Sequence, residues 1–180
     1  MKKFSLRSMM LCALFAALIC VGAFIRIPMP AVPFTLQTMF VLMAGSLLGS
    51  GAGAASALIY MLLGLLGLPV FTAGGGLGYV LRPSFGYILG FVPGAYIAGK
   101  LSFRRLRSQY MRVLFASITG LLVIYAFGMI YYWLLCVFYL HTQIGFWPLL
   151  LNFFIIFLPG DTAMCFVGAL ATVRLRPALV

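Results

Sequence analysis

Residues 34–68 read FTLQTMFVLMAGSLLGSGAGAASALIYMLLGLLGL, two apolar runs that flank a short Gly-Ser-Gly segment. The stretch has no charged residue, and each run approaches the length of a helix that crosses a bilayer. The segment Gly49–Gly51 is so short and flexible that it predicts a tight turn between antiparallel helices. We therefore predict two neighbouring transmembrane helices, at residues 34–48 and 52–68.

The rest of the chain has the same apolar character. Of its 180 residues, 65% are hydrophobic and 7% are charged, with a mean hydropathy of +1.20. Soluble domains carry about a quarter charged residues, so a soluble fold is excluded. We predict an all-α, polytopic membrane protein that forms one integral membrane domain over residues 1–180. Its six transmembrane helices, joined by short loops, are expected at about 8–25, 34–48, 52–68, 85–101, 113–140 and 159–173.

The last apolar run, residues 146–173, is too long for one straight span. At 1.5 Å per residue it would measure about 42 Å, against a hydrocarbon core of about 30 Å. Pro159–Gly160 interrupts it. We expect a short interfacial or re-entrant helix at residues 147–157, then the sixth span, with Pro159 in its first turn, where proline is tolerated. A single kinked helix is the alternative.

The basic residues predict the orientation of the chain. There are 12 Lys and Arg residues but a single acid, Asp161, and a single histidine, His141. Ten of the basic residues lie near the chain ends or the connection after the fourth span, which places them on one face, and Arg26 and Arg82 lie on the other. Basic residues concentrate on the cytoplasmic side. We expect a plasma membrane protein with both termini in the cytoplasm, whose net charge of +11 reflects this topology and not nucleic-acid binding.

The ionisable residues are too few for most catalytic sites. One acid and one distant histidine provide neither a paired acid and base nor a metal-ligand set. The four cysteines lie within apolar runs without a CxxC pattern, which is typical of small buried hydrophobic residues. We expect no cofactor, no metal and no catalytic residue. A small membrane enzyme remains the alternative from a different functional class.

Several polar residues are expected near the outer ends of the spans. Asp161 is costly in lipid, so it must face a cavity or a partner unless it only caps its helix. Arg82 lies on the same side and is either its electrostatic counterpart or an interfacial residue. Thr35 and Gln37 lie at the mouth of the second span, where they contact a ligand or cap the helix. The same candidate set includes Phe34, Tyr79, Tyr87 and Asn152, around the glycine-rich outer loop of residues 69–84.

The first span carries Ala13 and Ala17, a pair of small residues one helical turn apart. Such a pattern lets two helices approach closely, although it is frequent by chance in alanine-rich helices. Both alanines are candidates for contact with a partner.

Five motifs follow one another along most of the chain: Pro33–Thr38, Gly64–Phe71, Gly74–Tyr79, Pro83–Tyr87 and Leu158–Asp161. In this order and spacing they resemble the motifs of the BioY family, the biotin-binding substrate components (S components) of energy-coupling factor (ECF) transporters. The resemblance implies a six-helix protein that captures biotin at its outer face. It also implies partners: a transmembrane scaffold subunit that carries two ATPases, with Ala13 and Ala17 packed on the scaffold. Family members commonly have a Pro-Gly-Asp-x-x-Lys pattern at the sixth span, whereas Met164 occupies the lysine position here.

The resemblance leads to an expected function without covalent chemistry. We expect Asp161, Asn152, Thr35 or Gln37 to bond the ureido ring of biotin, with an apolar and aromatic wall around the rest of the ligand. Because Met164 replaces the usual lysine, Arg82 is expected to meet the valerate carboxylate. Another small vitamin on the same architecture is the alternative. The run Gly74–Gly78 is not followed by Lys-Ser/Thr, so energy must come from a partner or from a gradient.

Overall fold

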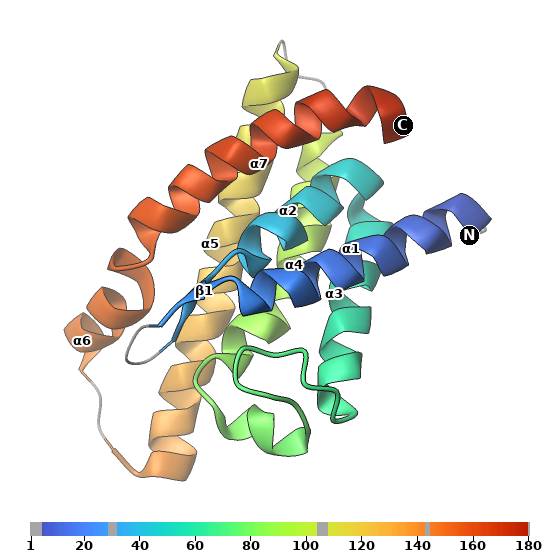
Figure 1. Ribbon diagram of the computed structural model, residues 1–180. Helices are drawn as coiled ribbons and strands as arrows, with labels where there is room; N and C mark the ends of the chain where they lie inside the picture. Colours follow the sequence, from blue (N-terminus) through green and yellow to red (C-terminus); the bar gives the residue numbers. More distant parts are fainter. Residues whose placement is uncertain (1–4, 29–31, 104–107, 143–144, 180) are drawn as a thin grey trace.

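The computed structural model describes residues 5–28, 32–103, 108–142 and 145–179, and this part of the chain forms an all-α bundle (Figure 1). Its long helices are α1 (Leu6–Phe24), α2 (Gln37–Leu48), α3 (Ser50–Leu65), α4 (Phe85–Ser102), α5 (Gln109–Leu135) and α7 (Leu158–Leu179). The predicted all-α class is confirmed. By length and composition, three helical segments of the described chain are apolar enough to cross a membrane: Leu6–Phe24, Gln109–Leu140 and Phe146–Pro177.

Helix α2 forms the centre of the bundle. It contacts α1, α3, α4, α5 and α7, and each of its residues from Val41 to Leu47 is buried. A helix that is apolar on all sides is typical of such a central position. The absence of charge in residues 37–48 is thus explained, since a charged side chain on the central part of α2 would be buried among other helices.

Glycines allow the helices around α2 to approach at backbone distance. A methyl group on Gly45 would overlap the carbonyl group of Ala95 in α4, and one on Gly53 of α3 would overlap the backbone at Gly45. The turn between α2 and α3 is tighter than predicted: Gly49 alone separates them, with φ +90°, and Ser50 already begins α3. Only glycine adopts such a conformation without strain.

A two-stranded hairpin precedes α2, which was not predicted. Strand β1 (Arg26–Ile27) pairs antiparallel with β2 (Phe34–Thr35), and Arg26 lies opposite Thr35. The prediction that the second helix begins at residue 34 is therefore wrong, because two residues are used in the ladder and the helix begins at Gln37. On the same side of the molecule, the glycine-rich loop after α3 contains a short 3₁₀ helix, η1 (Leu77–Leu81).

Between α5 and α7 the described chain forms two further helical stretches, residues 136–140 and 146–155. Helix α5 continues as a π-helical segment, η2 (Cys136–Leu140), and ends at His141 in the left-handed conformation. After it come α6 (Phe146–Leu150), the π-helical segment η3 (Leu151–Ile155), a turn at residues 156–157, and α7. This arrangement lies between the two expectations for residues 146–173: the short helix is present, but only a turn separates it from α7. An apolar groove between α5 and α6 is lined by residues that include Met129, Trp133 and Phe146.

Candidate functional site

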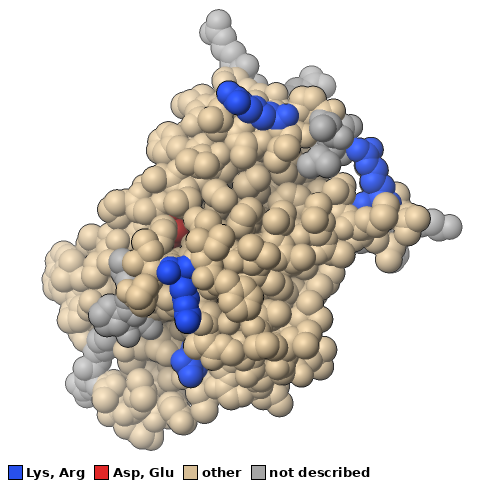
Figure 2. Space-filling view, viewed as in Figure 1, with Lys and Arg blue, Asp and Glu red and all other residues tan. Residues whose placement is uncertain are grey.

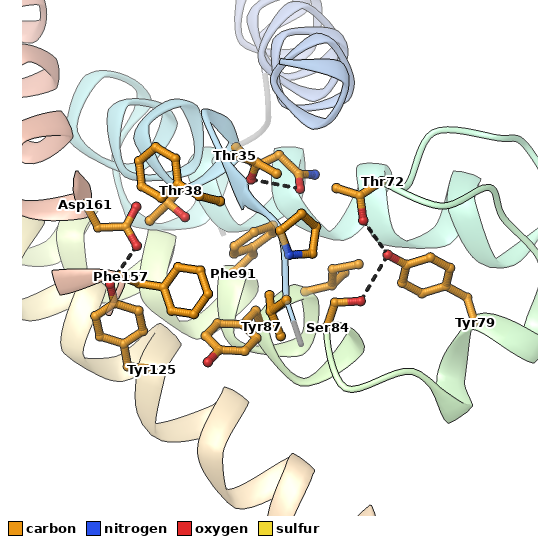
Figure 3. Close-up of a pocket in the computed structure, with 15 residues that line it drawn as sticks. Thr35, Thr38, Thr72, Tyr79, Ser84, Tyr87, Phe91, Tyr125, Phe157 and Asp161 are labelled. Carbon is orange, nitrogen blue, oxygen red and sulfur yellow. Dashed lines mark hydrogen bonds between the residues drawn. The ribbon is translucent and has the colours of Figure 1, made fainter. Parts of the chain in front are cut away.

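A pocket lies where the hairpin, the glycine-rich loop and four helices meet (Figure 3). Its lining comes from β2, the start of α2, the loop around η1, α4, α5 and the start of α7. The cavity volume within it is about 40 Å³. Small-molecule sites measure about 300–1,000 Å³, so the pocket walls must move apart to admit a ligand the size of a vitamin.

Asp161 is the charged group of the pocket lining, taken over the described residues. It lies in the first turn of α7 and is 5% exposed. The Tyr125 hydroxyl of α5 donates a hydrogen bond of 2.6 Å to one carboxylate oxygen (Figure 3). An ionised carboxylate accepts about four hydrogen bonds through its two oxygens. Asp161 therefore has capacity left for a donor on a ligand, and the positive end of α7 favours its charge.

Thr35 and Gln37 place a second polar group in the lining, and both are buried. The hairpin brings Thr35 to the start of α2, where its hydroxyl donates a 3.3 Å hydrogen bond to Oε1 of Gln37. Nε2 of Gln37 donates to the Tyr60 hydroxyl at 2.5 Å. These contacts hold the Gln37 amide in the wall of the pocket.

Tyr79 connects the glycine-rich loop to the pocket. Its ring packs against Phe71 at a centroid distance of 4.5 Å, and Tyr79 is the buried residue of η1. Its hydroxyl lies 2.7 Å from Oγ1 of Thr72 and accepts a hydrogen bond of 3.1 Å from Ser84 (Figure 3). The three side chains line the pocket together. The loop is thus held by its own polar contacts on the side that lines the pocket.

Aromatic rings form the apolar wall. Tyr87 donates a 2.6 Å hydrogen bond to the backbone oxygen of Phe153 and meets the Tyr125 ring edge-on at 6.2 Å. Phe34 lies against Gly160, where any larger residue would overlap its ring. This contact places β2 beside the turn that begins α7. Phe91 and Phe157 complete the wall in Figure 3.

Six of the eight predicted ligand-binding candidates line this pocket: Phe34, Thr35, Gln37, Tyr79, Tyr87 and Asp161. The structure does not bring the other two to it. Asn152 is exposed on the short helical segment, where its side-chain amide donates to the Pro148 oxygen at 2.8 Å. Arg82 is exposed after η1, and its guanidinium lies 5.7 Å from the centroid of the Tyr79 ring.

The positive charges of the outer loops lie outside the pocket lining. The Arg26 guanidinium donates to the backbone oxygen of Thr72 and so joins the hairpin to the glycine-rich loop. In Figure 2 the basic side chains form separate blue areas on a largely tan surface, with one small red area. Within the described residues, no group of three or more His, Cys, Asp or Glu side chains could hold a metal ion.

The sequence interpretation missed several residues of the lining. Tyr125 is the most important, because it bonds Asp161 from a helix 36 residues earlier in the chain. It lies within a long apolar span, and nothing in the linear sequence pairs it with Asp161. Thr72 and Ser84 lie within the glycine-rich loop of residues 69–84, so their position in that loop was a usable signal. Thr38, Phe91 and Phe157 were also missed.

The two alanines of α1 point away from the bundle. Ala13 and Ala17 are exposed, whereas Phe15, Ala16 and Ile19 are buried among the described residues. A small, smooth strip therefore remains on the outer surface of α1.

Known proteins match this chain over almost its whole length. The model of the BioY family matches residues 1–180. A probable biotin transporter BioY of Lysinibacillus sphaericus is 41% identical over 175 residues, which cover 97% of this chain and 89% of the relative. The biotin transporter BioY of Thermotoga maritima is 36% identical over 177 residues, with 95% and 96% covered.

A solved structure shows the same fold. The crystal structure of the S-component for biotin from an ECF-type ABC transporter has a TM-score of 0.79 and 26% sequence identity, and the match covers 98% of this chain and 94% of that one. The family and the fold are those of transporter components of the membrane, not of enzymes. The predicted resemblance is thus confirmed, and the chain belongs to the BioY family.

Proposed function

We propose that this chain is the biotin-binding S component of an ECF transporter, which captures the vitamin at its outer face. The pocket described above carries the proposal. The ureido ring of biotin has two N–H donors and one carbonyl acceptor in a plane, and Asp161 and Gln37 offer acceptors while Thr38 offers a hydroxyl donor. The thioether ring and valeryl chain suit the aromatic wall of Phe34 and Phe91.

Calorimetry on the purified protein tests this function. Titration with biotin is expected to give one site per chain, whereas thiamine and riboflavin give no heat above dilution. Binding of another vitamin without biotin would support the alternative of the same architecture with a different ligand. Hydrolysis of a supplied ester or amide would favour the membrane enzyme instead.

We further propose that both termini lie in the cytoplasm of a plasma membrane protein. Figure 1 supports a common side for the termini, because the N and C labels lie on one side of the molecule, away from the hairpin. The basic residues near the chain ends favour the cytoplasm for that side. Cysteine at Gly78 is expected to react with an impermeant maleimide added to intact cells, and cysteine at Ser108 only after lysis. Gly78 has open space around it, whereas a side chain at the neighbouring Gly75 would overlap the Leu68 backbone. Labelling of the parent protein measures the background from its four native cysteines. Labelling of Ser108→Cys from outside would reverse the orientation.

Release of biotin inside the cell would require a scaffold subunit with two ATPases, and we propose the exposed strip of α1 as its contact. Ala13→Leu and Ala17→Leu are expected to reduce biotin uptake by reconstituted transporter at least tenfold, because bulk prevents close helix approach. Binding of biotin to the isolated subunit should stay within twofold, since α1 contributes no residue to the pocket lining among those described. Ala126→Leu, at an exposed position of α5, is the matched control. Equal loss of binding and uptake would place the alanines in the core instead.

Arg82 is proposed to attract the valerate carboxylate from outside the lining. Because Arg82 is exposed, its replacement should cause only a small loss of biotin affinity. Charge pairs in water are screened and contribute up to about 1 kcal/mol. Arg82→Gln should therefore weaken biotin by up to about fivefold at low salt and leave its methyl ester unchanged. Arg174→Gln, an exposed arginine at the end of α7, is the control. Equal weakening of acid and ester would show that Arg82 acts through Tyr79 packing alone.

A further inference from the structure

Tyr60 of α3 lies behind the pocket wall and does not belong to the described lining. It is fully buried, at 0% exposure. Its hydroxyl meets two groups: it accepts from Nε2 of Gln37 at 2.5 Å and donates to the backbone oxygen of Val70 at 3.4 Å. Gln37 does line the pocket, so Tyr60 is one residue removed from a ligand there.

The hydrogen of the Tyr60 hydroxyl determines which end of the Gln37 amide faces the pocket. A phenol has one hydrogen, and a backbone oxygen can only accept. Because this hydrogen goes to Val70, the Tyr60 oxygen can only accept from Gln37, which requires the NH₂ group on that side. Oε1 then lies on the other side, where the Thr35 hydroxyl donates to it (Figure 3). The reversed amide would lose the bond to Val70.

The Tyr60 ring has little freedom to move. It packs edge-on against Phe71 at a centroid distance of 5.4 Å, and it lies tilted against Phe91 at 6.4 Å. Phe71 in turn lies directly against Gly64, one turn after Tyr60 on α3, where a methyl group would overlap its ring. The hydroxyl is therefore held at one place between α2 and the glycine-rich loop.

We propose that Tyr60 is a positioning residue that turns the Gln37 amide so that its carbonyl oxygen, and not its NH₂ group, faces the ligand. A carbonyl oxygen accepts two hydrogen bonds, and Thr35 supplies one of them. The second is available to an N–H group of a bound ligand. The site would thus select a ligand with an N–H donor at this point, such as a cyclic urea, and reject one whose nitrogen is substituted. The ligand class rests on the proposed function, while the amide orientation does not.

The first test needs no ligand. The chain has three glutamines, Gln37, Gln109 and Gln143, so ¹⁵N-glutamine labelling gives three side-chain amide signals. The signal missing in Gln37→Leu identifies Gln37. We expect its NH₂ group to exchange with solvent at least tenfold faster in Tyr60→Phe than in the parent protein. Unchanged exchange would overturn the orientation, whatever the ligand is.

The second test is a double-mutant cycle on biotin affinity. Tyr60→Phe should weaken biotin about tenfold in the parent protein but less than twofold in Gln37→Leu, because its effect passes through the amide. Equal weakening in both backgrounds would show that Tyr60 only supports the packing of the loop. Tyr131→Phe is the matched control, since its hydroxyl also donates to a backbone oxygen of this loop, that of Val80.

Ligand analogues keep the proposal open to refutation even if Tyr60→Phe does not fold. The parent protein is expected to prefer biotin over its ureido N-methyl derivatives, and Gln37→Leu should reduce that preference at least fivefold for one of the two nitrogens. An unchanged preference would overturn the proposal. If Tyr60→Phe shows the predicted faster amide exchange but the parent protein binds no biotin, the proposed function fails, whereas the role of Tyr60 in orienting the amide stands.

Discussion

Replacing Asp161 with alanine is expected to weaken biotin binding by about 1.5–3 kcal/mol, the range of a hydrogen bond to a charged group. The loss corresponds to roughly 10- to 100-fold in affinity. Its physical reason is the position of the carboxylate, which is buried in the lining with one oxygen bonded to Tyr125. Calorimetry on the purified protein measures the effect.

Two variants separate the charge of Asp161 from its shape. Asp161→Asn should be as damaging as alanine, because an amide that accepts from Tyr125 turns its NH₂ donor toward the pocket. Tyr125→Phe retains the carboxylate and should weaken biotin less than Asp161→Asn. If Asp161→Asn binds biotin as tightly as the parent protein, the carboxylate only caps α7.

Replacing Gly45 with alanine is expected to have the largest effect on folding. The added methyl group would meet the Ala95 carbonyl of α4, which is backbone and cannot turn aside as a side chain would. We expect a loss of roughly 3 kcal/mol or more, at or above the upper end of overpacking effects in cores. Gly45→Val should give no monodisperse protein at all in detergent.

The matched control is Gly51→Ala in α3. No atom lies within 4 Å of a methyl group at this position, and alanine is the better helix former. Size-exclusion chromatography after heating reports thermal unfolding. The melting temperature of Gly51→Ala should be equal to or above that of the parent protein. A melting temperature of Gly45→Ala within two degrees of the parent would mean that α2 and α4 can separate locally without loss of stability.

The parts of the fold that the sequence predicts are those set by long, uniform patterns. Apolar runs mark α1, α3 and α5 closely, since a helix in lipid needs many consecutive apolar residues. The hairpin could not be predicted in this way. Arg26–Ile27 and Phe34–Thr35 are too short for an alternating pattern, and their pairing depends on a tertiary arrangement.

The candidate site also contains residues that the sequence predicts and residues whose placement depends on the tertiary structure. Thr35, Gln37 and Asp161 were predicted because polar residues at the ends of apolar spans are unusual. Arg82 and Asn152 were placed at the ligand from their position along the chain, which does not give the direction of a side chain. Arg82 turns to the Tyr79 ring, and Asn152 bonds the preceding helical turn.

The location of the two tryptophans determines what optical spectroscopy of this protein reports. Trp133 and Trp147, 48% and 67% exposed on α5 and α6, do not belong to the described pocket lining. The aromatic rings of the lining belong to tyrosine and phenylalanine instead. Indole emission therefore follows the surrounding lipid or detergent, and a fluorescence titration with vitamin needs an added reporter near the mouth of the pocket.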